Sequence, residues 1–135
     1  MELTKAMLAS ASGLRAQSVR MRIISENLAN QDSIALKPGG EPYRRKIVTF
    51  GTELDREMGV TVVKANGISY DQSKFGKNHD PGNPAADKDG YVLKSNVNGM
   101  IEMMDMSQAQ RSYQSNLNAL EGTRRMATMT LDLLR

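Results

Sequence analysis

The chain of 135 residues contains no cysteine and a single histidine, His79. The lack of cysteine excludes a disulfide framework and a thiol nucleophile. One histidine cannot form the paired-histidine zinc motifs, and it leaves little capacity for acid–base chemistry near neutral pH. The sequence therefore argues against an enzyme, and we expect no catalytic residue, no cofactor and no metal ion.

Aromatic residues and long apolar runs are also scarce. The chain has two Phe, four Tyr and no Trp, whereas it has ten Met, a flexible residue that suits helix packing surfaces. No stretch approaches the roughly 18 consecutive apolar residues that span a bilayer. The first residues also lack the pattern of a cleaved secretory signal. We therefore expect helix-on-helix packing, no small-molecule substrate, no direct membrane insertion and no cleaved signal peptide.

Apolar residues recur every seven positions near both ends of the chain, a spacing that predicts two long helices. The first is expected over residues 3–29, ending near Asn30, a residue that tolerates the left-handed conformation of a C-cap. The second is expected over residues 97–134, with Asn96 as its N-cap. The large residues on the repeat, which we call the seam residues, are Met7, Leu14, Met21, Leu28, Met106, Tyr113, Leu117, Leu120, Leu131 and Leu134.

The middle of the chain has a different character. Short β-branched and aromatic runs at residues 46–50, 60–63, 68–70 and 91–93 predict a small, irregular β element of three or four strands. Residues 72–90 are rich in turn-forming residues and are expected to form a long loop. So small a middle can cover only a little of the apolar surface of the helices. We therefore expect the remainder to meet other chains or to stay unfolded.

The predicted fold class is mainly α with a small β element. Long N- and C-terminal helices pair as a coiled-coil-like domain, and the middle forms an irregular β-rich domain. The expected division assigns residues 1–30 to the first helix, 31–95 to the β-rich and loop domain, and 96–135 to the second helix of the coiled-coil domain.

Two polar motifs in the middle resemble functional sites, and each has a simpler interpretation. Asp87-Lys88-Asp89-Gly90 resembles part of a calcium loop, but the decisive ligand positions hold Ala85 and Asn96, so an Asx turn is favoured. His79-Asp80 has no accompanying nucleophile motif and is interpreted as part of a solvated loop.

Basic residues cluster only at Arg20-Met21-Arg22 and Arg44-Arg45-Lys46. A nucleic-acid-binding face needs a larger basic surface or interleaved aromatic residues. We therefore expect solvated positions or ion pairs with another subunit. Because the formal net charge is +3, a small basic helical nucleic-acid-associated protein is kept as the alternative.

Motifs near both ends resemble signatures of the bacterial flagellar basal-body rod and hook family. At the N-terminal end they are Ser12-Gly13-Leu14, Gln17 and Ser25-Glu26-Asn27-Leu28-Ala29-Asn30. Towards the C-terminal end they are Asn96-Val97-Asn98 through Met104, Ala109-Gln110-Arg111-Ser112-Tyr113 with Asn116, and Thr130-Leu131-Asp132-Leu133-Leu134. Within the family, residues 42–46 and 87–92 resemble the subunits of the proximal rod.

The resemblance implies a structural, non-enzymatic subunit of the flagellar basal-body proximal rod. It implies polymerisation with other rod subunits and with copies of the same chain into the axial drive shaft and export channel for bacterial motility. The terminal helices would form the inner coiled-coil domain, with the β element outside. Export by the flagellar type III apparatus without a cleaved signal, a location in the rod across the periplasm, and no nucleic-acid partner are also implied.

Overall fold

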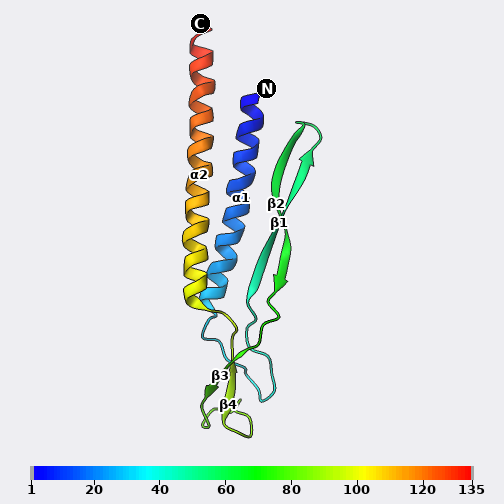
Figure 1. Cartoon of the computed structure of the whole chain (residues 1–135), viewed down its shortest axis with the longest axis vertical. Helices are drawn as coiled ribbons and strands as arrows, with labels where there is room; N and C mark the ends of the chain where they lie inside the picture. The colour runs from blue at the N-terminus through cyan, green and yellow to red at the C-terminus, as the bar shows by residue number, and fades with distance from the viewer. Residues whose placement is uncertain (1, 135) are drawn as a thin grey trace. The chain divides into compact units, whose positions relative to one another are not determined.

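The computed structural model describes residues 2–134. Two long helices lie at the ends of the described chain, α1 over Glu2–Ala29 and α2 over Gly99–Asp132 (Figure 1). Four strands lie between them: β1 is Lys46–Asp55, β2 is Val60–Tyr70, β3 is Gly76–His79 and β4 is Tyr91–Lys94. Strands β1 and β2 form one two-stranded sheet, and β3 and β4 form a second.

The prediction of a mainly α fold is wrong, because about 47% of the described chain is helix and about 23% is strand, which makes the fold α+β. The difference comes mostly from β1 and β2, which are 10 and 11 residues long. The runs expected at 60–63 and 68–70 are one continuous strand that passes through Asn66 and Gly67. Glycine weakens a strand without ending it. The sequence prediction therefore treated one strand as two separate runs.

The second sheet lies partly inside the expected loop 72–90. Strand β3 pairs antiparallel with β4, from Gly76 opposite Lys94 to His79 opposite Tyr91. The connection ends in an Asx turn, since Asp87 Oδ1 accepts from Asp89 N at 3.0 Å and from Tyr91 N at 2.9 Å. The Asx turn is therefore confirmed, whereas the expectation of an uninterrupted loop is wrong.

Contacts along the chain divide it into two compact units. Unit 1 comprises Met1–Met21, Val48–Gly67 and Ser107–Arg135, and unit 2 comprises Arg22–Ile47 and Ile68–Met106. Each unit therefore combines part of α1, part of the β1–β2 hairpin and part of α2. The three-part division expected from the sequence, at residues 1–30, 31–95 and 96–135, stays a prediction.

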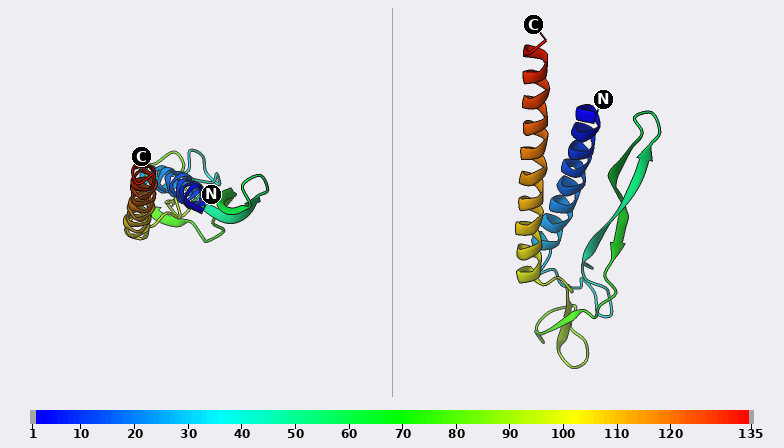
Figure 2. Two further views of the ribbon diagram at one scale, coloured as in Figure 1. Left: turned by 90° about the horizontal axis from the view of Figure 1, so that it is seen from above. Right: turned by 45° about the horizontal axis from the view of Figure 1, so that its top comes forward.

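Unit 1 contains an antiparallel helix pair. The first part of α1 runs antiparallel to the second half of α2, as the views in Figures 1 and 2 agree, and Arg20 donates to Gln108 Oε1 at 3.3 Å. A Cβ added to Gly13 would lie 2.8 Å from Asn116 Nδ2, so glycine permits the close approach. Small residues fill this part of the helices, because Ala16 and Ala109 are buried. Within residues 2–134, neither helix is both long and apolar enough to cross a membrane.

Asparagines end α1 and begin α2, but not as predicted. Asn30 closes α1 by donating from Nδ2 to the Glu26 carbonyl at 2.8 Å. Among the described residues only glycines have positive φ, so the left-handed cap is wrong. Asn98 is the N-cap of α2, since its Oδ1 accepts from Met100 N at 3.0 Å. Asn96, which we expected to be this cap, is used elsewhere because α2 starts two residues later than predicted.

Candidate functional site

A cluster of polar side chains in unit 2 joins three segments that are far apart in the sequence. At its centre is Asn27, near the end of α1, with only 1% of its surface exposed. Its Oδ1 accepts from Lys46 N at 3.0 Å and from Tyr43 Oη at 2.9 Å. Its Nδ2 donates to the Lys46 carbonyl at 2.9 Å and to Glu102 Oε2 at 3.1 Å. We call this set, Asn27, Tyr43, Arg45, Lys46, Asp71, Asn96 and Glu102, the Asn27 junction.

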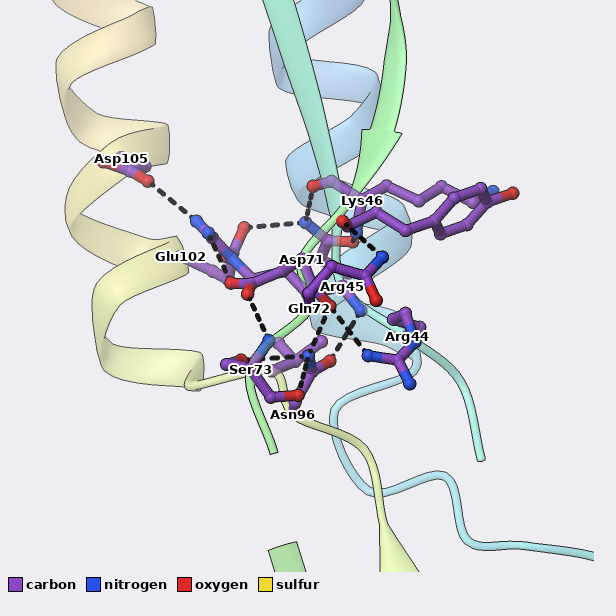
Figure 3. Close-up of polar contacts among 12 residues, drawn as sticks. Arg44, Arg45, Lys46, Asp71, Gln72, Ser73, Asn96, Glu102 and Asp105 are labelled. Atoms are coloured by element: carbon purple, nitrogen blue, oxygen red, sulfur yellow. Dashed lines mark hydrogen bonds and ion pairs between the residues drawn. The ribbon is translucent and has the colours of Figure 1, made fainter. Parts of the chain in front are cut away.

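Glu102 is the second buried polar residue of the junction, also 1% exposed, in the first turn of α2. Its Oε1 accepts from Arg45 Nε at 2.5 Å, so the carboxylate is both paired and hydrogen-bonded. The Arg45 guanidinium also lies 3.5 Å from Asp71 Oδ2 and 3.5 Å from Asp105 Oδ2 (Figure 3). Burying a carboxylate is costly unless it has such partners. Arg45 therefore offsets the cost of burying the charge on Glu102.

Asn96 completes the junction on the side of the second sheet. Its Oδ1 accepts from the Arg45 backbone N–H at 2.7 Å, and its Nδ2 donates to the Asp71 carbonyl at 3.1 Å (Figure 3). A backbone bond from Asp71 N to the Arg45 carbonyl, at 2.9 Å, joins the same two segments. The asparagine amide therefore connects the segment before β1 to the segment after β2.

Two charged groups of the junction, Arg45 and Asp71, and the neighbouring Glu26 have shifted pKa values with identifiable causes. The hydrogen bond from Lys46 lowers the pKa of Glu26. Hydrogen bonds from Ser73, followed by Arg45, lower the pKa of Asp71. Burial opposes the charge on Arg45, but its bonds and charge interactions with Glu102 and Asp71 raise its pKa overall. Every one of these shifts favours the charged forms, as expected of a structural network rather than of an acid–base catalyst.

No group of three or more acidic, histidine or cysteine residues suited to a metal ion occurs within residues 2–134. The basic cluster at residues 44–46 also differs from expectation. Arg45 pairs with three carboxylates, Lys46 lies 2.9 Å from Glu26 Oε2, and Arg44 stacks on the Phe75 ring at 4.3 Å. The prediction of solvated residues or ion pairs with another subunit is wrong for these three, because their partners lie in the same chain.

The structure gives separate tasks to the residues of the N-terminal motif, Ser25-Glu26-Asn27-Leu28-Ala29-Asn30. Glu26 pairs with Lys46, Asn27 forms the junction and Asn30 caps α1. Leu28 is half-buried, whereas Ser25 and Ala29 are exposed. The motif therefore builds the contact between the end of α1 and the start of β1, and it reaches the C-terminal motif through Glu102.

The earlier part of the N-terminal signature, Ser12-Gly13, forms a separate set of contacts in unit 1. Ser12 is buried, and its Oγ accepts from Val63 N of β2 at 3.1 Å while donating to the Ala9 carbonyl at 2.7 Å. Gly13 lies against Asn116 of α2. Adjacent motif residues thus hold α1 to the hairpin and to the second helix.

The seam residues are not the most buried residues of the helices. Leu131 and Leu134 are exposed, and the others are half-buried: Met7, Leu14, Met21, Leu28, Met106, Tyr113, Leu117 and Leu120. Full burial goes instead to Ser12, Ala16, Ile23, Asn27, Glu102, Ala109 and Thr123, among others. Half-burial leaves apolar surface for a neighbour, and the role of the seam in assembly stays a prediction.

Sequence reasoning missed Glu102 and Arg45. The signal available was the single acidic residue in a run of four large apolar residues, Met100, Ile101, Met103 and Met104, all of which are exposed. A prediction from hydrophobic periodicity buries the apolar residues and exposes Glu102. In the structure Glu102 is buried and the four apolar residues are exposed.

An apolar groove of about 420 Å³ lies in unit 1 between α1 and the hairpin. Leu8, Ala16, Val19, Val62, Val63 and Ala65 form its apolar wall. Arg15, Glu53, Asp55 and Lys64 also line it, and Lys64 Nζ lies 2.8 Å from Glu53 Oε2.

Comparison with known proteins gives one family-model match to part of the chain and relatives that cover 92–98% of it. A family model described as the C-terminal part of flagellar basal body rod FlgEFG proteins matches residues 88–133, which include β4 and α2. A flagellar basal-body rod protein FlgC of Agrobacterium fabrum is 50% identical over 133 residues, covering 98% of this chain and 96% of the relative. FlgC of Bacillus subtilis is 39% identical, covering 92% and 93%, and FlgC of Salmonella typhimurium is 38% identical, covering 92% of each. These matches confirm the resemblance drawn from the terminal motifs: the chain belongs to the FlgC family of flagellar basal-body rod proteins.

Proposed function

We propose that this chain is a structural, non-enzymatic subunit of the flagellar basal-body rod that assembles with other rod subunits into the axial drive shaft for motility. Its similarity to FlgC rod proteins over nearly the whole chain supports the assignment. A rod protein acts through its surfaces, and the polar clusters in this chain hold helices and strands together instead of converging on a substrate.

The observation that carries the proposal is the apolar surface of α2. Met100, Met103 and Met104 in unit 2 are each more than 60% exposed, and Met126 and Met129 in unit 1 are also exposed. Large apolar side chains exposed in this way mark candidate interaction sites in each unit. The seam residues of both helices add half-buried apolar surface beside these sites, so we assign them to contacts with neighbouring rod subunits.

The finer parts of the proposal concern location and export. The chain occupies the proximal part of the rod, across the periplasm, and contacts copies of itself as well as other rod subunits. The paired helices line the export channel and the strands lie outside. The flagellar type III apparatus exports the chain largely unfolded and without cleaving a signal, and neighbours then order the apolar helix ends.

The alternative, a nucleic-acid-associated protein, gains no support from the relatives, which are rod proteins. Two residues of the basic cluster at residues 44–46, Arg45 and Lys46, are paired with carboxylates of the same chain. Pairing removes the free positive charge that binding to phosphates requires.

The test is incorporation into basal bodies in a motile bacterium that lacks its own copy of the protein. We expect the full chain to enter purified basal bodies, and deletion of residues 2–24 to abolish incorporation while the remaining middle stays folded. Failure of the full chain to incorporate, in a strain where the native rod protein does so, would refute the rod function.

Intact-mass measurement on the same basal bodies tests the export proposal. We expect a chain that is uncut apart from removal of Met1. A mature form that starts near residue 15–25 would mean that a signal peptidase had acted, and the type III proposal would be wrong.

A further inference from the structure

The register of the helix pair in unit 1 leaves the end of α2 without α1 beside it. Gly13 of α1 lies against Asn116 of α2. Arg20, which follows Gly13 by seven residues, donates a hydrogen bond to Gln108, which precedes Asn116 by eight. The helices are antiparallel and rise equally per residue, so Glu2, where α1 begins, lies opposite roughly residue 127. Residues from about 128 to 134 therefore extend beyond α1, in agreement with the views in Figures 1 and 2.

This extension, residues 128–134, is unusually apolar for an exposed helix end. Its sequence Thr-Met-Thr-Leu-Asp-Leu-Leu has one charged residue, Asp132. Leu131 is 66% exposed, Leu133 87% and Leu134 80%. Burying these leucines against an apolar surface would stabilise an assembly, because it removes apolar area from water.

The groove in unit 1 offers matching surface. It is lined by α1, β1 and β2 residues, and no α2 residue contributes to its described lining. Its volume of about 420 Å³ lies in the usual range of specific binding pockets. Leu8 and Val19 are only half-buried at its wall, and Val63 is exposed, so an apolar occupant would cover them.

Charges favour the same pairing. The groove has two carboxylates on β1, Glu53 and Asp55, with Lys64 on β2 and the exposed Arg15 on α1. Lys64 Nζ already pairs with Glu53 Oε2 at 2.8 Å, so Asp55 and Arg15 are the two lining charges without an ion pair among the described residues. The end of α2 has two exposed arginines, Arg124 and Arg125, and then Asp132 beyond them. We expect an α2 end lying in the groove to set one of these arginines against Asp55 and Asp132 against Arg15, which matches the two charges that the groove leaves without an ion pair.

We propose that the groove between α1 and the hairpin binds the apolar end of α2 from a second copy of this chain. Both halves of the contact are present on every copy, and they are different surfaces. Such a head-to-tail contact does not close on itself as a two-fold dimer does, so it propagates into an open assembly. The inference rests on the proposed rod function, which requires copies to add in one direction.

The lack of cysteine makes the contact directly testable by disulfide trapping in the full chain. The test variant carries Val63→Cys in the groove and Leu131→Cys in the extension. The matched control carries Val63→Cys with Leu36→Cys, a leucine of unit 2 that is 91% exposed. Each variant is introduced into the bacterium lacking its own copy, basal bodies are isolated, and disulfides are formed with a mild oxidant.

We expect the test variant to give a ladder of linked chains at least tenfold more abundant than in the control. Each single-cysteine variant can form only a homotypic dimer, and we expect neither to do so. A ladder from the test variant then requires a disulfide between position 63 of one copy and position 131 of the next, whereas dimers of both single-cysteine variants would overturn the inference. If the test variant is present in basal bodies but forms no more ladder than the control, the inference is wrong and the rod function stands. An adduct containing a different rod protein instead of this chain would also overturn it, by showing another occupant. Absence of the unmodified chain from basal bodies would instead refute the rod function.

Discussion

Replacing Asn27 with alanine tests whether the Asn27 junction stabilises the fold. The change removes the hydrogen bonds to Lys46 N, Lys46 O, Tyr43 Oη and Glu102 Oε2. A neutral hydrogen bond contributes about 0.5–1.5 kcal/mol net, and one to a charged group about 1.5–3 kcal/mol. Water entering the vacated space recovers part of the loss, so we expect Asn27→Ala to lower the free energy of unfolding by about 3–5 kcal/mol.

The assay is urea unfolding of the full chain, followed by far-ultraviolet circular dichroism. The matched control is Asn118→Ala, which removes an exposed amide that accepts one bond from Gln114 at 2.9 Å. Substitutions of this kind usually change the free energy of unfolding by no more than about 0.5 kcal/mol. If Asn27→Ala were no more destabilising than Asn118→Ala, the junction would not be a stabilising element and the reasoning would be refuted.

A second variant separates the hydrogen bonds from the volume of the side chain. Asn27→Asp keeps the size of the residue and its acceptor oxygen but removes the donor that faces Glu102. At pH 7 it also places two carboxylates against each other, so we expect it to destabilise at least as much as Asn27→Ala. Protonation restores a donor and removes the repulsion, so its deficit relative to the unmodified chain should shrink as the pH falls towards 4. A deficit independent of pH would contradict the contact with Glu102.

Three further predictions concern the seam, a turn and pH. Leu120→Asp loses up to about 1.5–3 kcal/mol of leucine burial and places a charge in an apolar contact; swimming should be lost while the protein is still produced, and normal motility would contradict the seam assignment. Gly90 has φ of +81°, and an added Cβ would lie 3.0 Å from Pro81 Cγ; Gly90→Ala should therefore lower the free energy of unfolding by about 1–2 kcal/mol, whereas Gly82→Ala, with only one atom at 3.8 Å, should not. The pKa values of Glu26 and Asp71 are lowered in the folded chain from 4.5 and 3.8, so the stability that these groups contribute is present above those values and lost as pH falls below them; the thermal midpoint should be lower at pH 3 than at pH 6, and an unchanged midpoint would exclude a stabilising role.

The sequence identified the helices well because their signal is local and repeated. The expected helix over 3–29 matches α1 at Glu2–Ala29, and the Asx turn at Asp87 followed from the preferences of four adjacent residues. The extent of the hairpin was underestimated, because pairing with a neighbouring strand decides whether a strand continues through Gly67.

The polar residues of the candidate site could not be assigned from sequence in the same way. Asn96 and Asn98 are both good N-cap residues, and only the position of the Arg45 backbone decides that Asn96 is used for a tertiary contact. Likewise Glu102 is buried because Arg45, 57 residues away, lies beside it. Such long-range pairs leave no periodic signal, although the family motif contains the residue, Asn27, that connects to them.

The hydrogen bonds of Asn27 go to the backbone N–H and C=O of Lys46, and this has a consequence for changes in chain length. The amide fixes where β1 starts irrespective of how many residues precede it. An insertion in the loop before it, near the exposed Leu36 and Gly39, is therefore absorbed locally. An insertion within Lys46–Asp55 instead moves every later side chain of that strand to the opposite face. Insertions and deletions among proteins built on this junction should accordingly be confined to the loop. Ile34 and Ala35 pair with β4, so a chimera made by exchanging only residues 36–40 should keep its fold.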